Sequence, residues 1–102
     1  MHSILDSAMA TLSDAQIEQR LQGAGDWRLG EDSSILRELS FPDFAAAIAF
    51  VNRVAELAEA ANQHPDILIH GWNKVRLELS THSEGGLTAA DFELAAQIDT
   101  VA

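Results

Sequence analysis

The stretch from Lys74 to Thr81 alternates apolar and polar side chains, and it constrains the fold more than any other part of the sequence. Val75, Leu77 and Leu79 are apolar, and the residues between them are Lys, Arg, Glu and Ser. Because successive side chains of a β-strand point to opposite faces, this pattern predicts a strand with one buried and one polar face. Such strands are typical of an antiparallel sheet that helices cover on one side.

The other elements are predicted from shorter signals. In chain order the patterns predict helix 13–22, strands 27–29 and 35–41, helix 42–62, strands 67–70 and 74–81, and a last helix from residue 88 onward. Ser13 with Gln16, and Thr88 with Asp91, have the spacing of a capping box at a helix start. Pro65 is expected to end the long helix, because the residue before a proline is pushed out of the α region. The order α-β-β-α-β-β-α predicts an α+β fold, with a four-stranded, mainly antiparallel sheet and helices packed on one face.

The long helix carries a wide apolar stripe. Its main face is predicted to hold Phe44, Ile48, Val51, Ala55 and Ala58, and the stripe is widened by Phe50, Val54, Leu57 and Ala61. A stripe of this width predicts packing both on the sheet and on a neighbouring subunit. A short chain also has a limited core of its own, so we expect a homo-oligomer, either a dimer or a tetramer.

Composition narrows the possible partners. The 102 residues hold 6 Lys and Arg against 16 Asp and Glu, a net charge of −10, which argues against nucleic acid and anionic membranes as main partners. The absence of cysteine excludes disulfides and a thiolate metal site. No apolar run approaches the roughly 18 residues of a membrane helix, and residues 1–10 hold no Lys or Arg of the kind that opens a secretory signal. We expect a cytoplasmic protein with one domain over residues 11–102, preceded by a frayed extension over 1–10.

Candidate chemistry is concentrated between residues 62 and 82, which contain His64, His70 and His82. Histidine suits proton transfer, because its unperturbed pKa is about 6.5. His64 precedes one predicted strand and His82 follows the next, so the two would lie close together if these strands pair antiparallel. The alternative for each is a solvated surface histidine, and His70 is interpreted in that way. No further ligands stand at a recognised metal spacing, so no metal site is predicted.

The residues of this region resemble a known family. The matching segments are Asn62-Gln63-His64-Pro65-Asp66, Trp72-Asn73-Lys74-Val75, Leu79-Ser80-Thr81-His82, Gly86-Leu87-Thr88 with Asp91, and upstream Gly25-Asp26-Trp27, Phe41-Pro42-Asp43-Phe44 and Phe50-Val51-Asn52-Arg53-Val54. Together they are similar to the pterin-4a-carbinolamine dehydratases over residues 12–101. The resemblance implies the same α+β fold. It also implies dehydration of 4a-hydroxytetrahydropterin to quinonoid dihydropterin in tetrahydrobiopterin recycling, without a metal or bound cofactor.

The resemblance also implies roles for individual residues. His82 matches an acid catalyst and His64 matches a second motif histidine, so both are candidate catalytic residues. Candidate substrate-binding residues are Gln63, Pro65, Asp66, Trp72, Ser80 and Thr81, with Glu59 at the place of an upstream charged residue. Gln63 stands where the motif has another histidine, and glutamine forms hydrogen bonds but cannot deliver a proton.

Gln63 leaves two interpretations open. In the first, the protein is a working dehydratase that relies on His82 and binds a small-molecule pterin. In the second, it is a dehydratase-like protein that has lost part of its chemistry and binds a protein partner. Family relatives of this second kind stabilise the dimer of a homeodomain transcription factor or act as RuBisCO assembly factors.

Overall fold

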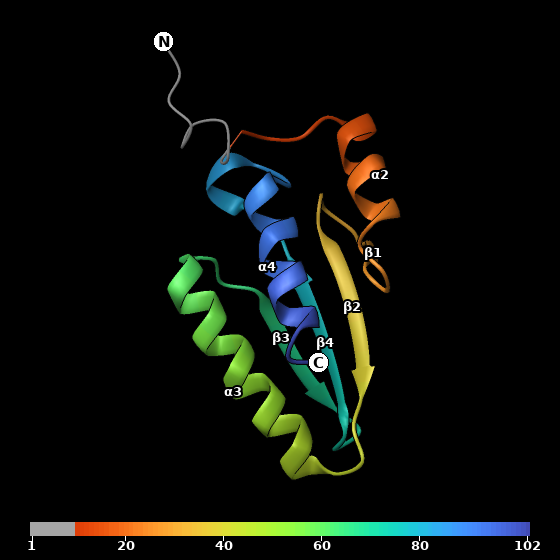
Figure 1. Ribbon diagram of the computed structural model, residues 1–102, viewed down its shortest axis with the longest axis vertical. Helices are drawn as coiled ribbons and strands as arrows, with labels where there is room; N and C mark the ends of the chain where they lie inside the picture. The colour runs from red at the N-terminus through yellow and green to blue at the C-terminus, as the bar shows by residue number, and fades with distance from the viewer. Residues whose placement is uncertain (1–9) are drawn as a thin grey trace.

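The computed structural model describes residues 10–102, so nearly all of the extension expected over residues 1–10 lies outside the described part. The elements of the described part are α2 (Asp14–Gln22), β1 (Arg28–Leu29), β2 (Ile35–Ser40), α3 (Phe44–Ala61), β3 (Asp66–His70), β4 (Lys74–Leu79), the short 3₁₀ helix η1 (His82–Glu84) and α4 (Ala89–Asp99). The predicted α+β fold and element order are confirmed (Figure 1). None of the described helices combines the length and hydropathy needed to cross a membrane.

The four strands form one sheet in the order β1-β2-β4-β3, and all neighbouring strands are antiparallel. Each predicted hairpin is present, and β2 joins the two hairpins by pairing with β4 along its whole length, from Ile35 opposite Leu79 to Ser40 opposite Lys74. The strand with the strict alternation therefore lies inside the sheet, and β3 lies at an edge.

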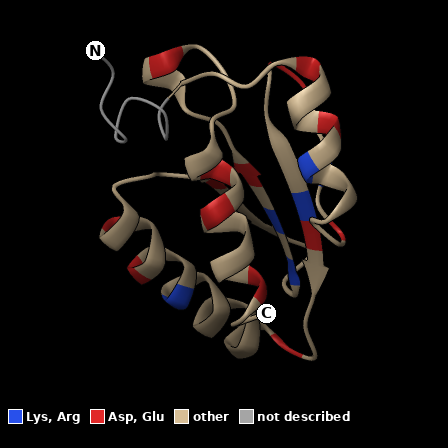
Figure 2. Cartoon of the chain, turned by 45° about the horizontal axis from the view of Figure 1, so that its top comes forward, with Lys and Arg blue, Asp and Glu red and all other residues tan. Residues whose placement is uncertain are grey.

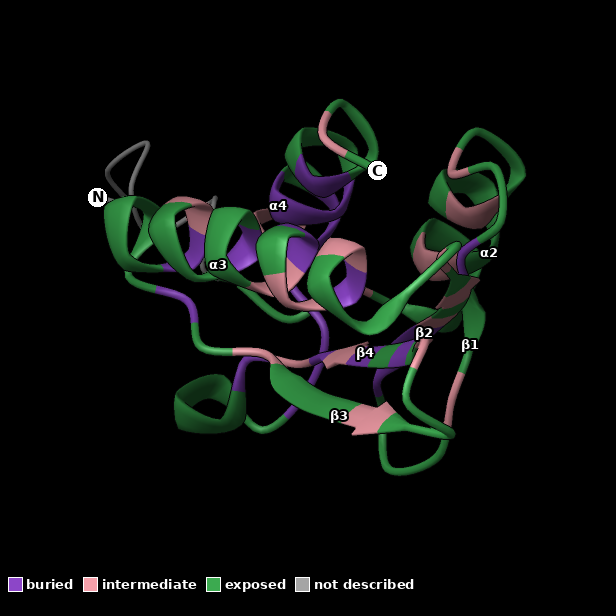
Figure 3. Ribbon diagram, turned by 90° about the horizontal axis from the view of Figure 1, so that it is seen from below, coloured by how far each residue is buried: buried purple, intermediate pink, exposed green. Residues whose placement is uncertain are grey.

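The alternation of β4 matches the two faces of this sheet. Val75, Leu77 and Leu79 are at most 1 % exposed, whereas Lys74 and Arg76 are exposed. Figure 3 shows α2, α3 and α4 on one side of the sheet. The apolar side chains of β4 belong to the core beneath these helices. The polar side chains of the same strand therefore face the opposite side of the sheet.

Helix α3 buries a face that is turned from the predicted main face and overlaps it at Ala58. Its buried residues are Ala47, Phe50, Val54 and Ala58, while Phe44 and Ala55 of the expected main face are exposed. The residues predicted only to widen the stripe thus supply much of the contact with the core. The apolar pattern runs nearly all round this alanine-rich helix, so spacing alone could not identify the side that meets the sheet.

The ends of α3 also differ from the prediction. Asp43 caps the start by accepting a hydrogen bond from the Ala46 N–H at 2.7 Å, and the helix begins at Phe44. The helix ends at Ala61 because Asn62 adopts the left-handed conformation (φ 53°, ψ 40°). Asparagine takes this conformation more readily than most residues. Three residues therefore separate the end of the helix from Pro65, which was expected to end it.

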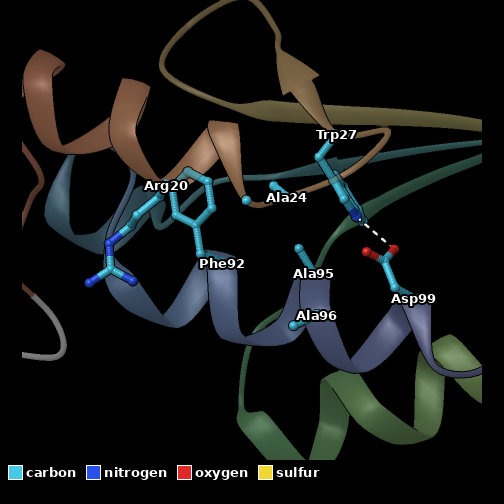
Figure 4. A pocket seen from close by; sticks show the side chains of 8 residues that line it. Arg20, Ala24, Trp27, Phe92, Ala95, Ala96 and Asp99 are labelled. Carbon is cyan, nitrogen blue, oxygen red and sulfur yellow. Dashed lines mark hydrogen bonds between the residues drawn. The ribbon is translucent and has the colours of Figure 1, made fainter.

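The last turn of α4 is tied to the start of the sheet through Asp99. The Trp27 indole Nε1–H donates to Asp99 Oδ1 at 2.8 Å (Figure 4). Arg37 forms an ion pair with the same oxygen. Trp27, predicted to begin a strand, is buried just before β1. A hollow of about 180 Å³ lies beside this contact, between α2 and α4.

Candidate active site

The β3–β4 hairpin brings the start of one strand to the end of the other, as predicted. Asp66, the first residue of β3, is paired with Glu78 near the end of β4. His64 stands two positions before Asp66, and Ser80 stands two positions after Glu78. The antiparallel pairing needed for His64 and His82 to approach each other is therefore present.

A hollow of about 270 Å³ opens at this end of the sheet. It is lined by Glu31, Asp32, Ser34, Asp66, Arg76, Glu78, Ser80 and His82. Three of the candidate residues predicted from the sequence thus share one cavity, namely His82, Ser80 and Asp66. Glu31, Asp32 and Ser34 were missed, because the pairing of β2 with β4 brings the 31–34 turn here and no local sequence pattern specifies that pairing. Arg76 and Glu78 were predicted only as part of the polar face of their strand.

Hydrogen bonds join the 31–34 turn to the end of β4. The Ser80 hydroxyl donates to the Ser33 carbonyl oxygen at 2.9 Å. The Ser34 hydroxyl oxygen lies 2.6 Å from both the Glu31 carbonyl oxygen and Glu78 Oε2. These contacts fix one wall of the hollow.

The lining of the hollow is acidic on balance. Four of its residues carry carboxyl groups, against one arginine and one histidine. Figure 2 shows acidic and basic residues together along the strands. Such a site does not favour an anionic ligand, so it suits a neutral or cationic molecule that makes hydrogen bonds.

The two candidate catalytic histidines differ in their surroundings. His82 is the first residue of η1 and is exposed at the hollow. His64 is exposed as well, does not line the hollow, and has its imidazole Nε2 2.7 Å from Glu59 Oε2. The pair between His64 and Glu59 links the loop before β3 back to the last turn of α3.

Gln63 and Thr81 lie beneath these histidines and are buried. Gln63 Nε2 donates to Thr81 Oγ1 at 3.2 Å and to Asp91 Oδ1 at 2.9 Å. The Asp91 carboxylate, which the sequence pattern placed at the start of the last helix, also accepts the Thr88 backbone N–H at 2.9 Å. Burial raises the pKa of Asp91, and the hydrogen bonds from Thr88, Thr81 and Gln63 oppose that rise.

The structure does not bring Trp72 to this site. Trp72 lies in the turn between β3 and β4, where it is 62 % exposed with φ at 62°. This turn is at the far end of both strands from His82. Pro65 is partly buried at the start of β3. The substrate-binding roles of Trp72 and Pro65 stay predictions, as does that of Gln63.

Within the described residues 10–102, no group of three or more His, Cys, Asp or Glu side chains is arranged to hold a metal ion. The groups available at the hollow are the imidazole of His82, the hydroxyls of Ser34 and Ser80, the guanidinium of Arg76 and carboxyl groups. Imidazoles and carboxyls can donate and accept protons, so the arrangement is suited to acid–base chemistry.

Comparison with known protein sequences shows which family the chain belongs to. Residues 10–101 match the profile of the family described as pterin 4 alpha carbinolamine dehydratase. The chain belongs to the pterin-4-alpha-carbinolamine dehydratase family. Two relatives assigned to this dehydratase, from Chloroflexus aggregans and Roseiflexus castenholzii, are 52 % identical over 93 residues and 53 % identical over 92 residues. The matches cover 91 % and 90 % of this chain, and 98 % and 97 % of the relatives.

Solved structures of dehydratase-like proteins share the fold. A protein of Brucella melitensis, described as a transcriptional coactivator/pterin dehydratase, superposes with a TM-score of 0.85 at 29 % identity, over 90 % of this chain and 98 % of that one. A pterin dehydratase-like protein, described as a RuBisCO assembly factor in the α-carboxysome, gives a TM-score of 0.62 at 28 % identity, over 74 % and 88 %. The fold of this dehydratase family is therefore found in proteins described by different roles.

Proposed function

We propose that the protein dehydrates 4a-hydroxytetrahydropterin to quinonoid dihydropterin by histidine acid–base catalysis. Membership of the dehydratase family supports the substrate class. The observation that carries the proposal is the placing of His82, Ser80 and Asp66 around one solvent-accessible hollow. Its volume of about 270 Å³ is near the lower end of the roughly 300–1,000 Å³ of small-molecule sites.

The reaction needs two proton transfers. The bond from C4a to the hydroxyl oxygen breaks as an acid protonates that oxygen, and water leaves. A base takes the proton from the neighbouring ring nitrogen, and a carbon–nitrogen double bond forms. We assign the first transfer to His82, because its imidazole is exposed at the hollow.

His64 is assigned a second role at the edge of the site. Its imidazole is held by Glu59, which limits the orientations available to the ring. From this position it would contact the part of the pterin that extends beyond the hollow or exchange a proton with it. The acidic lining is compatible with a pterin, which is nearly neutral and rich in hydrogen-bond donors.

The activity test is dehydration of freshly generated 4a-carbinolamine. The wild type is expected to exceed the uncatalysed rate, and His82→Ala is expected to lose most of the excess, since a positioned acid contributes about 10² to 10⁴-fold. His70→Ala is the matched control, because His70 is an exposed histidine at the other end of the same hairpin. A wild-type rate equal to the uncatalysed rate would overturn the proposal.

We propose that this activity serves tetrahydrobiopterin recycling in the cytoplasm, and that the protein acts as a homo-oligomer. The exposed edge strand β3 and the exposed apolar side chains Phe44, Leu68 and Trp72 support self-association. Molar mass in solution, measured by light scattering, tests the oligomer directly.

A second candidate function is binding or assembly of another protein. The likeness to the solved structure described as a RuBisCO assembly factor favours it. In that case affinity purification from the native cell should recover a stoichiometric partner, and His82→Ala should still bind it. A robust dehydratase rate with no recovered partner would remove this candidate.

A further inference from the structure

A closed hydrogen-bond network lies beneath the two candidate histidines. It joins Gln63 from the loop before β3, Thr81 after β4, and Thr88 with Asp91 at the start of α4. Thr88 and Asp91 are fully buried, and Thr81 is 2 % exposed. The loop before β3 is therefore joined in the protein interior to the end of β4 and the start of α4.

The direction of each hydrogen bond can be assigned. The Thr81 hydroxyl donates its single proton to Asp91 Oδ2 at 2.8 Å. The Thr88 hydroxyl, 2.9 Å from Thr81 Oγ1, must then be the donor in that contact. The two oxygens of Asp91 accept from Gln63, Thr81 and the Thr88 backbone, which is the arrangement expected for a carboxylate.

Both donors of the Gln63 amide are used inside the protein. A side-chain amide has two N–H groups, and here the nitrogen contacts Thr81 Oγ1 and Asp91 Oδ1. No N–H of Gln63 is left for a substrate. Leaving the buried Asp91 oxygen without this donor costs about 1–3 kcal/mol, or more because the group is charged, so exchanging the internal bond for a substrate contact is unfavourable.

The network lies next to the proposed chemistry in the chain. Gln63 directly precedes His64, and Thr81 directly precedes His82. Both histidines are exposed, so little packing fixes them directly. The buried residue before each histidine anchors the backbone there, in addition to the contact that His64 makes with Glu59.

We propose that Gln63 and Asp91 form a buried amide–carboxylate clamp that positions His64 and His82, with Thr81 as the link between them. The catalytic role of this clamp rests on the proposed function. Gln63 is on this view a positioning residue, and it supports the site by holding two backbone segments together rather than by touching the pterin.

The catalytic arm of the test uses Gln63→Leu, which keeps a side chain of similar size without donors. We expect kcat to fall about 10 to 100-fold with little change in KM, since displacement of a catalytic group by 1 Å can cost about 10²-fold. The matched control is Gln97→Leu, the same replacement at an exposed position on α4. A rise in KM at unchanged kcat would overturn the clamp and favour direct substrate binding.

Gln63→Glu should recover kcat as pH falls, which a variant with a general packing defect would not do. A protonated carboxyl at position 63 can donate to Asp91, whereas an ionised carboxyl there repels it. His82 is the other ionisable group that acts on Asp91. The ratio of kcat for Gln63→Glu to kcat for the wild type should therefore fall as pH rises. A ratio that stays constant with pH would contradict the clamp.

An NMR arm separates this inference from the proposed activity. In Gln63→Leu the imidazole C–H resonances of His64 and His82 should both move, while that of His70 stays in place as an internal reference. If these shifts occur and the wild type is inactive, the clamp stands and the dehydratase proposal fails. If both resonances stay in place in folded Gln63→Leu, the clamp is overturned whether or not the enzyme is active.

Discussion

Trp72 and His82 lie at opposite ends of β4, although only ten positions separate them in the sequence. β4 has six residues, and at about 3.4 Å per residue it spans about 20 Å. One pterin is too small to contact both side chains within a single chain. The sequence pattern that groups these residues therefore does not by itself define one binding site.

Trp72→Ala tests this separation. We expect kcat/KM for the carbinolamine to change by less than about twofold, as for a surface substitution away from the site. Trp72→Phe, which keeps an aromatic ring, is the matched control. A loss of more than about tenfold, far outside that range, with unchanged molar mass would show that a second copy of the chain supplies its tryptophan to the hollow.

Gln63→His tests the cost of glutamine at this position. The side chain at this position contacts Thr81 and Asp91 in the interior and does not line the hollow. A neutral imidazole has one N–H where the amide has two, so we expect the dehydration rate to stay at or below that of the wild type. Steady-state rates of the two proteins with fresh carbinolamine provide the measurement. A rise of about 10²-fold, the lower end of what a positioned acid contributes, would mean that the side chain at position 63 reaches the pterin and would contradict its supporting role.

The burial of Asp91 predicts a pH-dependent stability. Its pKa is raised above the ordinary value of 3.8, so the protonated carboxyl favours the folded state. This stabilisation is fully present below pH 3.8 and is lost as pH rises through the raised pKa. The free energy of unfolding of the wild type minus that of Asp91→Asn should therefore fall over this range in urea titrations, and a flat difference would contradict the prediction.

Asp99→Ala should destabilise the protein. It removes the acceptor of the buried Trp27 indole N–H and a partner of Arg37, whose Nε already has no hydrogen-bond partner among the described residues. We expect a loss of about 2 kcal/mol and a melting temperature lower by roughly 10 °C. Asp26→Ala is the control, because the side chain of Asp26 is 84 % exposed and 3.6 Å from Arg37, and it should change stability very little.

The sequence predicted the fold well where one local signal was sufficient. The alternation of β4, the cap at Ser13 and the start of α4 at Thr88 depend on spacing within a few residues, and all three are found in the structure. The buried face of α3 was predicted only in part, because apolar residues surround most of that helix and the choice depends on the sheet it meets.

The candidate site shows the same limit. His82, Ser80 and Asp66 could be grouped because one hairpin connects them. The inward bonds of Gln63 and the approach of the 31–34 turn depend on contacts with α4 and β2, which no local pattern specifies. Sequence reasoning therefore named residues around the site, and the structure was needed to separate those that line the hollow from those that support it.

The position of β4 has a consequence for how the chain is made. β4 is the last strand to emerge during synthesis, yet it lies between β2 and β3 and provides their connection in the sheet. A nascent chain that ends before residue 74 has two strands without their common partner, and apolar surface of α3 without a completed sheet beneath it. The four-stranded sheet and the hollow at its end therefore cannot be completed before β4 is available, and until then unpaired strand edges and apolar surface expose the chain to aggregation.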